Sequence, residues 1–177
     1  MGEFLTDIET LRERARQHIR QGPITAGYGA DPERVVAVLN EALATELVCV
    51  LRYKRHYHTA TGIHAGPVAQ EFLQHAAEEQ AHADQLATRI TQLQGRPDFN
   101  PEGLATRSHS EYDDSEGLVA MITEDLVAER VAIASYSEII RWLGDGDPVT
   151  RRLFEDILAQ EEEHADDLLN LLDDLEG

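Results

Sequence analysis

Hydrophobic residues recur every three or four positions along most of the chain, which is the spacing of a helix with one buried face. A short segment of this kind covers residues 3–20, and a glycine-containing linker follows at 21–30. No segment alternates like a strand, so we predict an all-α protein. Four longer segments show the same spacing, and they are residues 31–60, 66–95, 115–143 and 147–177.

Helix-capping residues support these boundaries. Asp31-Pro32 and Asp147-Pro148 each place an N-capping aspartate before a proline at the first helical position. Gly95, with a proline two residues later, is a helix stop signal. The polar connection 96–114 lacks periodicity and is long for a compact domain. Two tight connections and one long crossover predict a four-helix bundle of the single-crossover type.

The length of 177 residues fits one domain with a single core. We assign an N-terminal helix and linker to residues 1–30 and the bundle to residues 31–177. With 34 Asp+Glu against 15 Lys+Arg, the chain lacks the cationic excess that phosphate contacts need, so we do not expect DNA as its main partner. Membrane-spanning and secretory segments are not apparent. Cys49 is the single cysteine, and we expect a core residue in a cytoplasmic protein.

Each of the four apolar stripes is interrupted near its middle by a glutamate. In the second and fourth helices a histidine follows three residues later, and residues with this spacing project to the same side of a helix. One cation can therefore contact both members of a Glu-x-x-His pair. The interrupting residues are Glu46, Glu79, His82, Glu129, Glu161 and His164.

The two histidine motifs, AEEQAHAD at 77–84 and QEEEHADD at 160–167, share a glutamate only at the third position before the histidine. We therefore expect Glu78, Glu162 and Glu163 to be solvated. Surface decoration is the usual explanation of a lone Glu-x-x-His. Two copies, each preceded by a stripe glutamate 33 or 32 residues earlier, favour a metal site instead.

Burying four carboxylates together without cations is very costly. One pair of carboxylates at 4 Å repels by about 4 kcal/mol at an effective dielectric constant of 20. Two divalent cations balance four carboxylates, and mixed oxygen and nitrogen ligands suit iron, or alternatively manganese, better than structural zinc. By symmetry we expect one metal to be bound by Glu46 with His82, the other by Glu129 with His164, and both to be bridged by Glu79 and Glu161.

The chain resembles the bacterioferritin branch of the ferritin-like superfamily over about residues 35 to 173. The segments that carry the resemblance are NEALATELVCVLRY, EEQAHAD, EDLVAER and AQEEEHADD. The resemblance implies two iron ions per subunit, held by the six residues above. Tyr53 matches a tyrosine beside the family's di-iron centre, where it is either a redox or hydrogen-bonding neighbour or a core aromatic. Haem-binding members have a methionine where this chain has Gln80, so no haem is expected.

The resemblance also implies a ferroxidase that oxidises ferrous iron with dioxygen or hydrogen peroxide, for iron storage or detoxification. We expect a homo-oligomeric cage of 12 or 24 subunits, with 12 slightly favoured because the chain stops 13 residues after His164. The first alternative is a non-storage di-metal redox enzyme, such as a rubrerythrin-like peroxidase or a manganese catalase. The second is a Dps-like DNA-protecting binder that uses the arginines of residues 12–20. The sequence leaves open the roles of the N-terminal extension and of His56, His58, His64 and His75.

Overall fold

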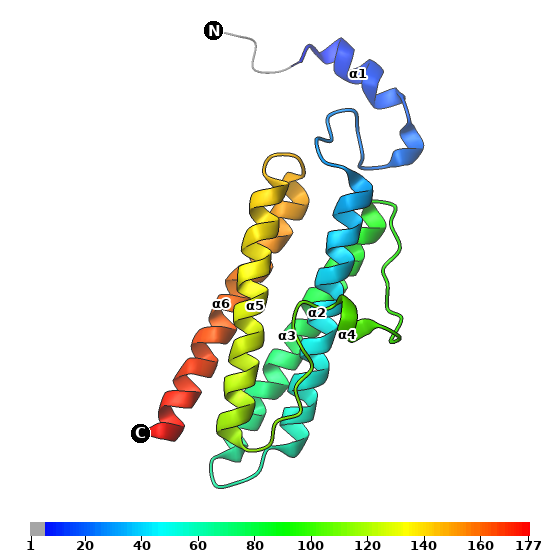
Figure 1. The fold of residues 1–177 in the computed structure, drawn as a ribbon. Coiled ribbons are helices and arrows are strands. Elements are labelled where there is room, and N and C mark those ends of the chain that lie inside the picture. Colours follow the sequence, from blue (N-terminus) through cyan, green and yellow to red (C-terminus); the bar gives the residue numbers. More distant parts are fainter. Residues whose placement is uncertain (1–5) are drawn as a thin grey trace.

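The computed structural model describes residues 6–177, which form helices and no strand. α2 runs antiparallel to α3, and α5 runs antiparallel to α6, as Figure 1 shows. α3 and α5 point the same way, so the connection between them crosses the length of the bundle. The predicted all-α bundle with one long crossover is therefore confirmed. Its four long helices are α2 (Pro32–Thr59), α3 (Ala65–Gln92), α5 (Leu118–Leu143) and α6 (Pro148–Glu176).

Both predicted aspartate N-caps are present. The Asp31 side chain accepts hydrogen bonds from the amides of Glu33 and Arg34 at the start of α2. Asp147 accepts one from the Thr150 amide at the start of α6. Asp147 is also buried and paired with Arg89 of α3 at 2.9 Å. This cap therefore also ties the end of α3 to the start of α6.

The end of α3 differs slightly from the prediction. The helix stops at Gln92, and Gln94 has a positive φ of 63°. The Gly95 amide then donates to the carbonyl of Ile90 at 2.9 Å. A Cβ at Gly95 would lie 2.6 Å from Cγ1 of Val36, so the glycine allows α2 to pass close to this turn.

Two other boundaries also differ. α5 begins at Leu118 rather than near Ser115. The crossover contains a single helical turn, α4 (Leu104–Arg107), beside α2. One turn is too short to show an apolar period in the sequence.

The N-terminal helix is shorter than predicted. α1 covers Ile8–Arg16, and a 3-10 turn, η1 (Ile19–Gln21), follows it. The prediction for residues 1–5 lies outside the described residues. Between α1 and η1 the chain turns at His18, which has a left-handed φ of 50°. α1 buries no residue and extends beyond the end of the bundle in Figure 1, so the described residues do not cover its apolar stripe.

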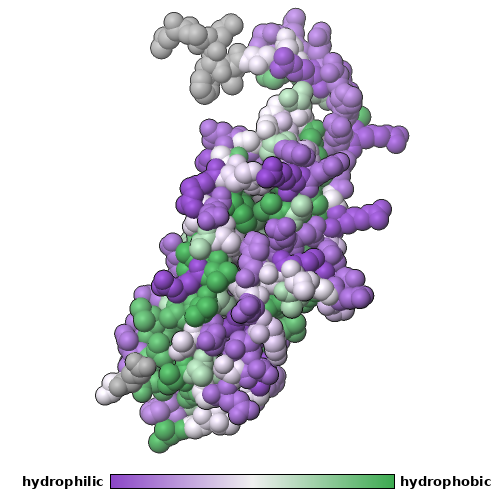
Figure 2. All heavy atoms as spheres, in the orientation of Figure 1, coloured by the Kyte–Doolittle hydropathy of each residue, from purple (hydrophilic) through white to green (hydrophobic). Residues whose placement is uncertain are grey.

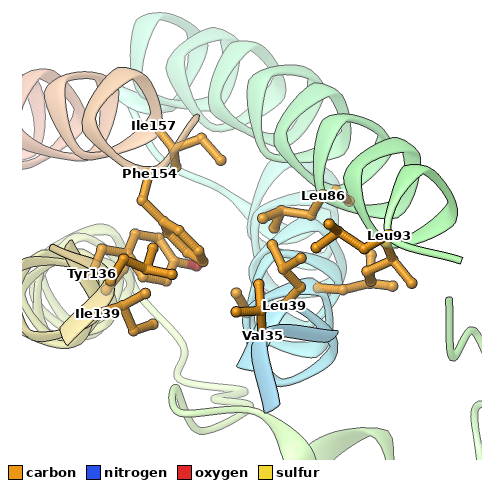
Figure 3. Packing of buried hydrophobic residues seen from close by; sticks show 14 residues of the cluster. Val35, Leu39, Leu86, Leu93, Tyr136, Ile139, Phe154 and Ile157 are labelled. Atoms are coloured by element: carbon orange, nitrogen blue, oxygen red, sulfur yellow. The ribbon is translucent and has the colours of Figure 1, made fainter. Parts of the chain in front are cut away.

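Two apolar clusters fill the bundle. The first lies toward the N-terminal end of α2, and Figure 3 shows Leu39, Leu86 and Phe154 pointing toward one another from three helices. The second lies toward the opposite end and contains Phe72 and Leu168. Cys49 also belongs to the second cluster, as predicted for a core residue. The charged residues that interrupt the four stripes lie between these clusters.

Candidate metal centre

All six predicted residues meet in the middle of the bundle. One comes from α2, two from α3, one from α5 and two from α6. Each is at least 97% buried, which is exceptional for glutamates. The six are Glu46, Glu79, His82, Glu129, Glu161 and His164.

Both histidines turn Nδ1 toward the carboxylates. Nδ1 of His82 lies 3.2 Å from Oε2 of Glu46 and 3.1 Å from Oε1 of Glu161. Nδ1 of His164 lies 3.1 Å from Oε1 of Glu79 and 3.9 Å from Oε1 of Glu129. The inner nitrogens of the two rings therefore lie at two positions within one cluster of carboxylates.

The donor atoms form two overlapping groups, and within each group they lie within 4.8 Å of one another. Glu79 and Glu161 belong to both groups. The geometry therefore offers two adjacent candidate cation positions, with two carboxylates able to bridge them. The groups are Glu46, Glu79, His82 and Glu161, and Glu79, Glu129, Glu161 and His164.

Nε2 of each histidine contacts a residue of the other histidine motif. Nε2 of His82 lies 2.9 Å from Oε1 of Gln160, and Nε2 of His164 lies 2.9 Å from Oε2 of Glu78. The expectation that Glu78 is solvated was wrong, because its side chain is only 33% exposed and bonds to His164. The sequence does carry a signal for these contacts, because the residue four positions before each histidine has a side-chain oxygen in both motifs. A histidine fixed in this way through Nε2 presents the lone pair of Nδ1 to a cation.

Two buried tyrosines hold the glutamates of the opposite helix. Tyr53 of α2 donates its hydroxyl hydrogen bond to Glu129 of α5. Tyr136 of α5 donates to Glu46 of α2 in the same way. Tyr136 was not predicted as a site residue, although it follows Glu129 by seven residues just as Tyr53 follows Glu46.

Burial and mutual repulsion leave the cluster with bound protons when no cation is present. Burial raises the pKa of Glu79 and of Glu129, and the neighbouring carboxylates raise both further. Burial also acts to raise the pKa of Glu161, but the nearby His164 and His82 rings outweigh it and lower that pKa. Burial acts to lower the pKa of His164, yet the contacts with Glu161 and Glu129 raise it to about 9. A cation that binds here must displace protons.

The donor set fits two divalent cations. Several buried donor atoms have no hydrogen-bond partner: Oε1 of Glu79, Oε2 of Glu129, both carboxylate oxygens of Glu161 and Nδ1 of His164. Buried polar atoms are normally satisfied, so these atoms are suited to binding a ligand. Four carboxylates balance the charge of two divalent ions, and the oxygen and nitrogen donors suit iron or manganese.

The four histidines whose roles the sequence leaves open divide into three kinds. His58 and His64 are exposed. His56 is buried and lies 2.8 Å from Asp125, which also pairs with Arg52 at 3.2 Å, so it ties α2 to α5. His75 is buried beside the centre, with Nδ1 3.3 Å from the Tyr53 hydroxyl.

Comparison with known proteins identifies the family. A family model for the ferritin-like domain matches residues 36–177. The bacterioferritin of Brucella melitensis biotype 1 is 33% identical over 142 residues, which are 79% of this chain and 83% of that protein. The dodecameric thioferritin of Bacteroides fragilis, a bacterioferritin-related protein, superposes with a TM-score of 0.79 at 32% identity, covering 83% of this chain and 89% of its own.

A second solved structure, the bacterioferritin of Desulfovibrio desulfuricans, contains a diiron site. It superposes with a TM-score of 0.73 at 27% identity and covers 82% of this chain and 81% of its own. These matches agree with the resemblance that the sequence motifs carry. The chain belongs to the ferritin-like family, and its relatives include bacterioferritins.

Proposed function

We propose that this protein is a ferroxidase that binds two ferrous ions between its four helices and oxidises them for iron storage or detoxification. The observation that carries the proposal is the pair of buried carboxylates, Glu79 and Glu161, shared by two adjacent groups of cation ligands. The diiron site of the D. desulfuricans bacterioferritin supports iron as the metal. Manganese in the same positions is the alternative.

The residues around the two ions position the ligands. Gln160 accepts a hydrogen bond from Nε2 of His82, and Glu78 accepts one from Nε2 of His164. Both rings therefore present Nδ1 to the metals. Tyr136 keeps the Glu46 carboxylate in place by a hydrogen bond from its hydroxyl, and Tyr53 does the same for Glu129 across the bundle. Protons displaced from the cluster leave as the ions bind.

The reaction is a two-electron transfer. Each ferrous ion gives one electron, and dioxygen with two protons becomes hydrogen peroxide. If peroxide is the oxidant instead, two electrons and two protons convert it to two water molecules. Placing both ions in one site delivers the two electrons to a single oxidant molecule.

We also propose that the protein works as a homo-oligomeric cage. The dodecameric assembly of its relative from B. fragilis supports 12 subunits, with 24 as the alternative. Figure 2 shows apolar atoms along α5 and α6, where the exposed residues include Val119, Val127 and Leu169. Such a surface is available for subunit contacts. Among the described residues, no helix combines the length and apolarity that crossing a membrane requires.

Stopped-flow oxidation of ferrous iron tests the catalytic part of the proposal. With two ferrous ions added per chain, Glu161→Gln is expected to reduce the initial rate by about 10- to 100-fold, because it removes a shared anionic ligand. Glu162→Gln is the matched control, since Glu162 is the exposed next residue and should keep the parent rate. Equal rates in the parent and Glu161→Gln would overturn the proposal.

Native mass measurement after iron loading in air tests the storage part. A cage of 12 or more subunits that takes up iron far beyond two ions per chain supports storage. A small oligomer that stops at two metals per chain, and that consumes peroxide, would show that the protein is a non-storage di-metal redox enzyme.

A further inference from the structure

A further group of ligand atoms lies beside the centre, between α3 and α6. Nε2 of His75 is 3.3 Å from Oε1 of Glu71 and 3.7 Å from Oδ2 of Asp167. Donor atoms of all three residues lie within 4.8 Å of one another. The histidine is fully buried, whereas the Glu71 and Asp167 side chains are 29% and 41% exposed. The group therefore opens toward solvent on one side only.

The histidine of this group has an unused nitrogen. Although buried, Nε2 of His75 has no hydrogen-bond partner of suitable geometry. The opposite nitrogen, Nδ1, is oriented by the Tyr53 hydroxyl at 3.3 Å. An imidazole fixed through one nitrogen with the other directed at two carboxylates is the arrangement that metal-binding histidines show. The two carboxylates repel each other unless a cation lies between them.

The group is connected to the proposed centre by a continuous series of ligand atoms. The ring of His75 stacks on the ring of His164, with 4.1 Å between the ring centroids and 25° between the planes. Donor atoms of His75, Glu78 and His164 also lie within 4.8 Å of one another. His75 therefore belongs to the outer group and to this intermediate group, and His164 belongs to the intermediate group and to the centre.

We propose that Glu71, His75 and Asp167 bind a third divalent cation, of the class that accepts mixed carboxylate and imidazole ligands. Two carboxylates balance the two charges of the ion, and the exposed side leaves positions for water. The identification of ferrous iron as the natural ion rests on the proposed function. The existence of the site does not, because it depends on these three side chains alone.

Cobalt(II) binding to the full-length protein under nitrogen tests the proposal. Equilibrium dialysis counts the ions per chain, and anomalous diffraction from crystals grown with cobalt locates them. The test variant is Glu71→Gln with Asp167→Asn, which keeps the size of both partly exposed side chains and so should preserve the fold. The matched control is Asp166→Asn, which changes an exposed carboxylate next to Asp167.

The parent and the control are expected to bind three cobalt ions per chain, one of them beside Nε2 of His75. The double variant is expected to lose that ion and keep the other two. No anomalous peak beside His75 in the parent, or an unchanged peak there in the double variant, would overturn the proposal. If the proposed di-metal centre does not bind cobalt, the result differs, because the two peaks among its six residues are then missing while the peak beside His75 remains.

Discussion

At the scale of single residues, the candidate centre depends on contacts that cross from one helix pair to the other. The Tyr136 hydroxyl of α5 bonds to Glu46 of α2, and the Tyr53 hydroxyl of α2 bonds to Glu129 of α5. Gln160 and Glu78 hold the two histidines in the same reciprocal way. Each proposed ligand of a single ion is therefore oriented by a residue from another helix.

Removal of the Tyr136 hydroxyl tests this orienting role. Tyr136→Phe keeps the ring that packs against Phe154 at 5.3 Å between centroids, so the fold should persist. We expect cobalt(II) affinity at the centre to fall by about 10- to 100-fold, because Glu46 loses the contact that fixes it. Equilibrium dialysis measures the change, and Tyr57→Phe, outside the cluster, is the control. Equal affinities in both variants would contradict the orienting role.

The proton content of the centre predicts how cation binding depends on pH. The pKa of His164 is raised to about 9 from an ordinary value of 6.5, so the metal-free ring is charged at neutral pH. Binding through Nδ1 removes that proton, and apparent affinity should rise by up to about tenfold per pH unit for each displaced proton until about pH 9. Calorimetry in buffers of different ionisation enthalpy counts the released protons. Affinity that stays constant between pH 6.5 and 9 would be inconsistent with this account.

In the metal-free protein, the raised pKa of His164 makes the folded state less stable as the pH rises. A raised pKa stabilises the folded state fully below pH 6.5, and this contribution is lost as the pH rises through about 9. The melting temperature of chelator-treated protein should therefore fall between pH 6.5 and 9.5, and by less in His164→Gln. An equal fall of the melting temperature in both proteins would show that His164 is not the cause.

At the scale of helices, the sequence predicts the elements well and their ends less well. The caps at Asp31 and Asp147 are local, because each aspartate needs only the next few amides. The stop at Gln92 and the turn at α4 depend on contacts with α2, which no local pattern records. The predicted helix over residues 3–20 is shorter for a similar reason, because within residues 6–177 α1 buries no side chain that would stabilise a longer helix.

The candidate site was predictable to the extent that it follows helical periodicity. The six proposed ligands interrupt apolar stripes and could be found by spacing alone. For Glu78 and Gln160 the sequence offers only a weaker signal, the side-chain oxygen four residues before each histidine. Their contacts cross to a histidine on the other helix, 86 or 78 residues away, which helical spacing does not show. Tyr136 looked like one more stripe residue, and only the matching seven-residue interval set it apart.

The turn after α3 gives a prediction at the same scale. Gly95→Ala should lower the free energy of unfolding by about 1–3 kcal/mol, because the added methyl group meets Val36 at 2.6 Å. Gly66→Ala in α3, where nothing lies within 4 Å, should leave stability unchanged or raise it slightly. Chemical denaturation compares the two. Equal effects would mean that the close contact at Gly95 relaxes without cost.

At the scale of the whole molecule, the centre joins the α2–α3 pair to the α5–α6 pair. Both candidate cation-binding groups include residues from both pairs, so cations bound there would link the halves of the bundle. Without cations, the repulsion among buried carboxylates acts against the fold, and two of them retain raised pKa values.

Metal binding is therefore expected to stabilise the whole bundle. A divalent ion at 100 times its dissociation constant adds about 2.7 kcal/mol to the free energy of unfolding. The melting temperature should rise on adding cobalt(II) and return with a chelator, whereas Glu161→Gln should show a smaller rise. A rise of the same size in that variant would place the stabilising ion elsewhere.

The most direct test of the di-metal centre is anomalous diffraction at the iron edge from crystals loaded with ferrous iron under nitrogen. We predict two iron peaks per chain within the cluster, about 3.5–4 Å apart. Glu79 and Glu161 should contact both peaks, with His82 at one and His164 at the other. A single peak in the cluster, or no peak there, would contradict the account.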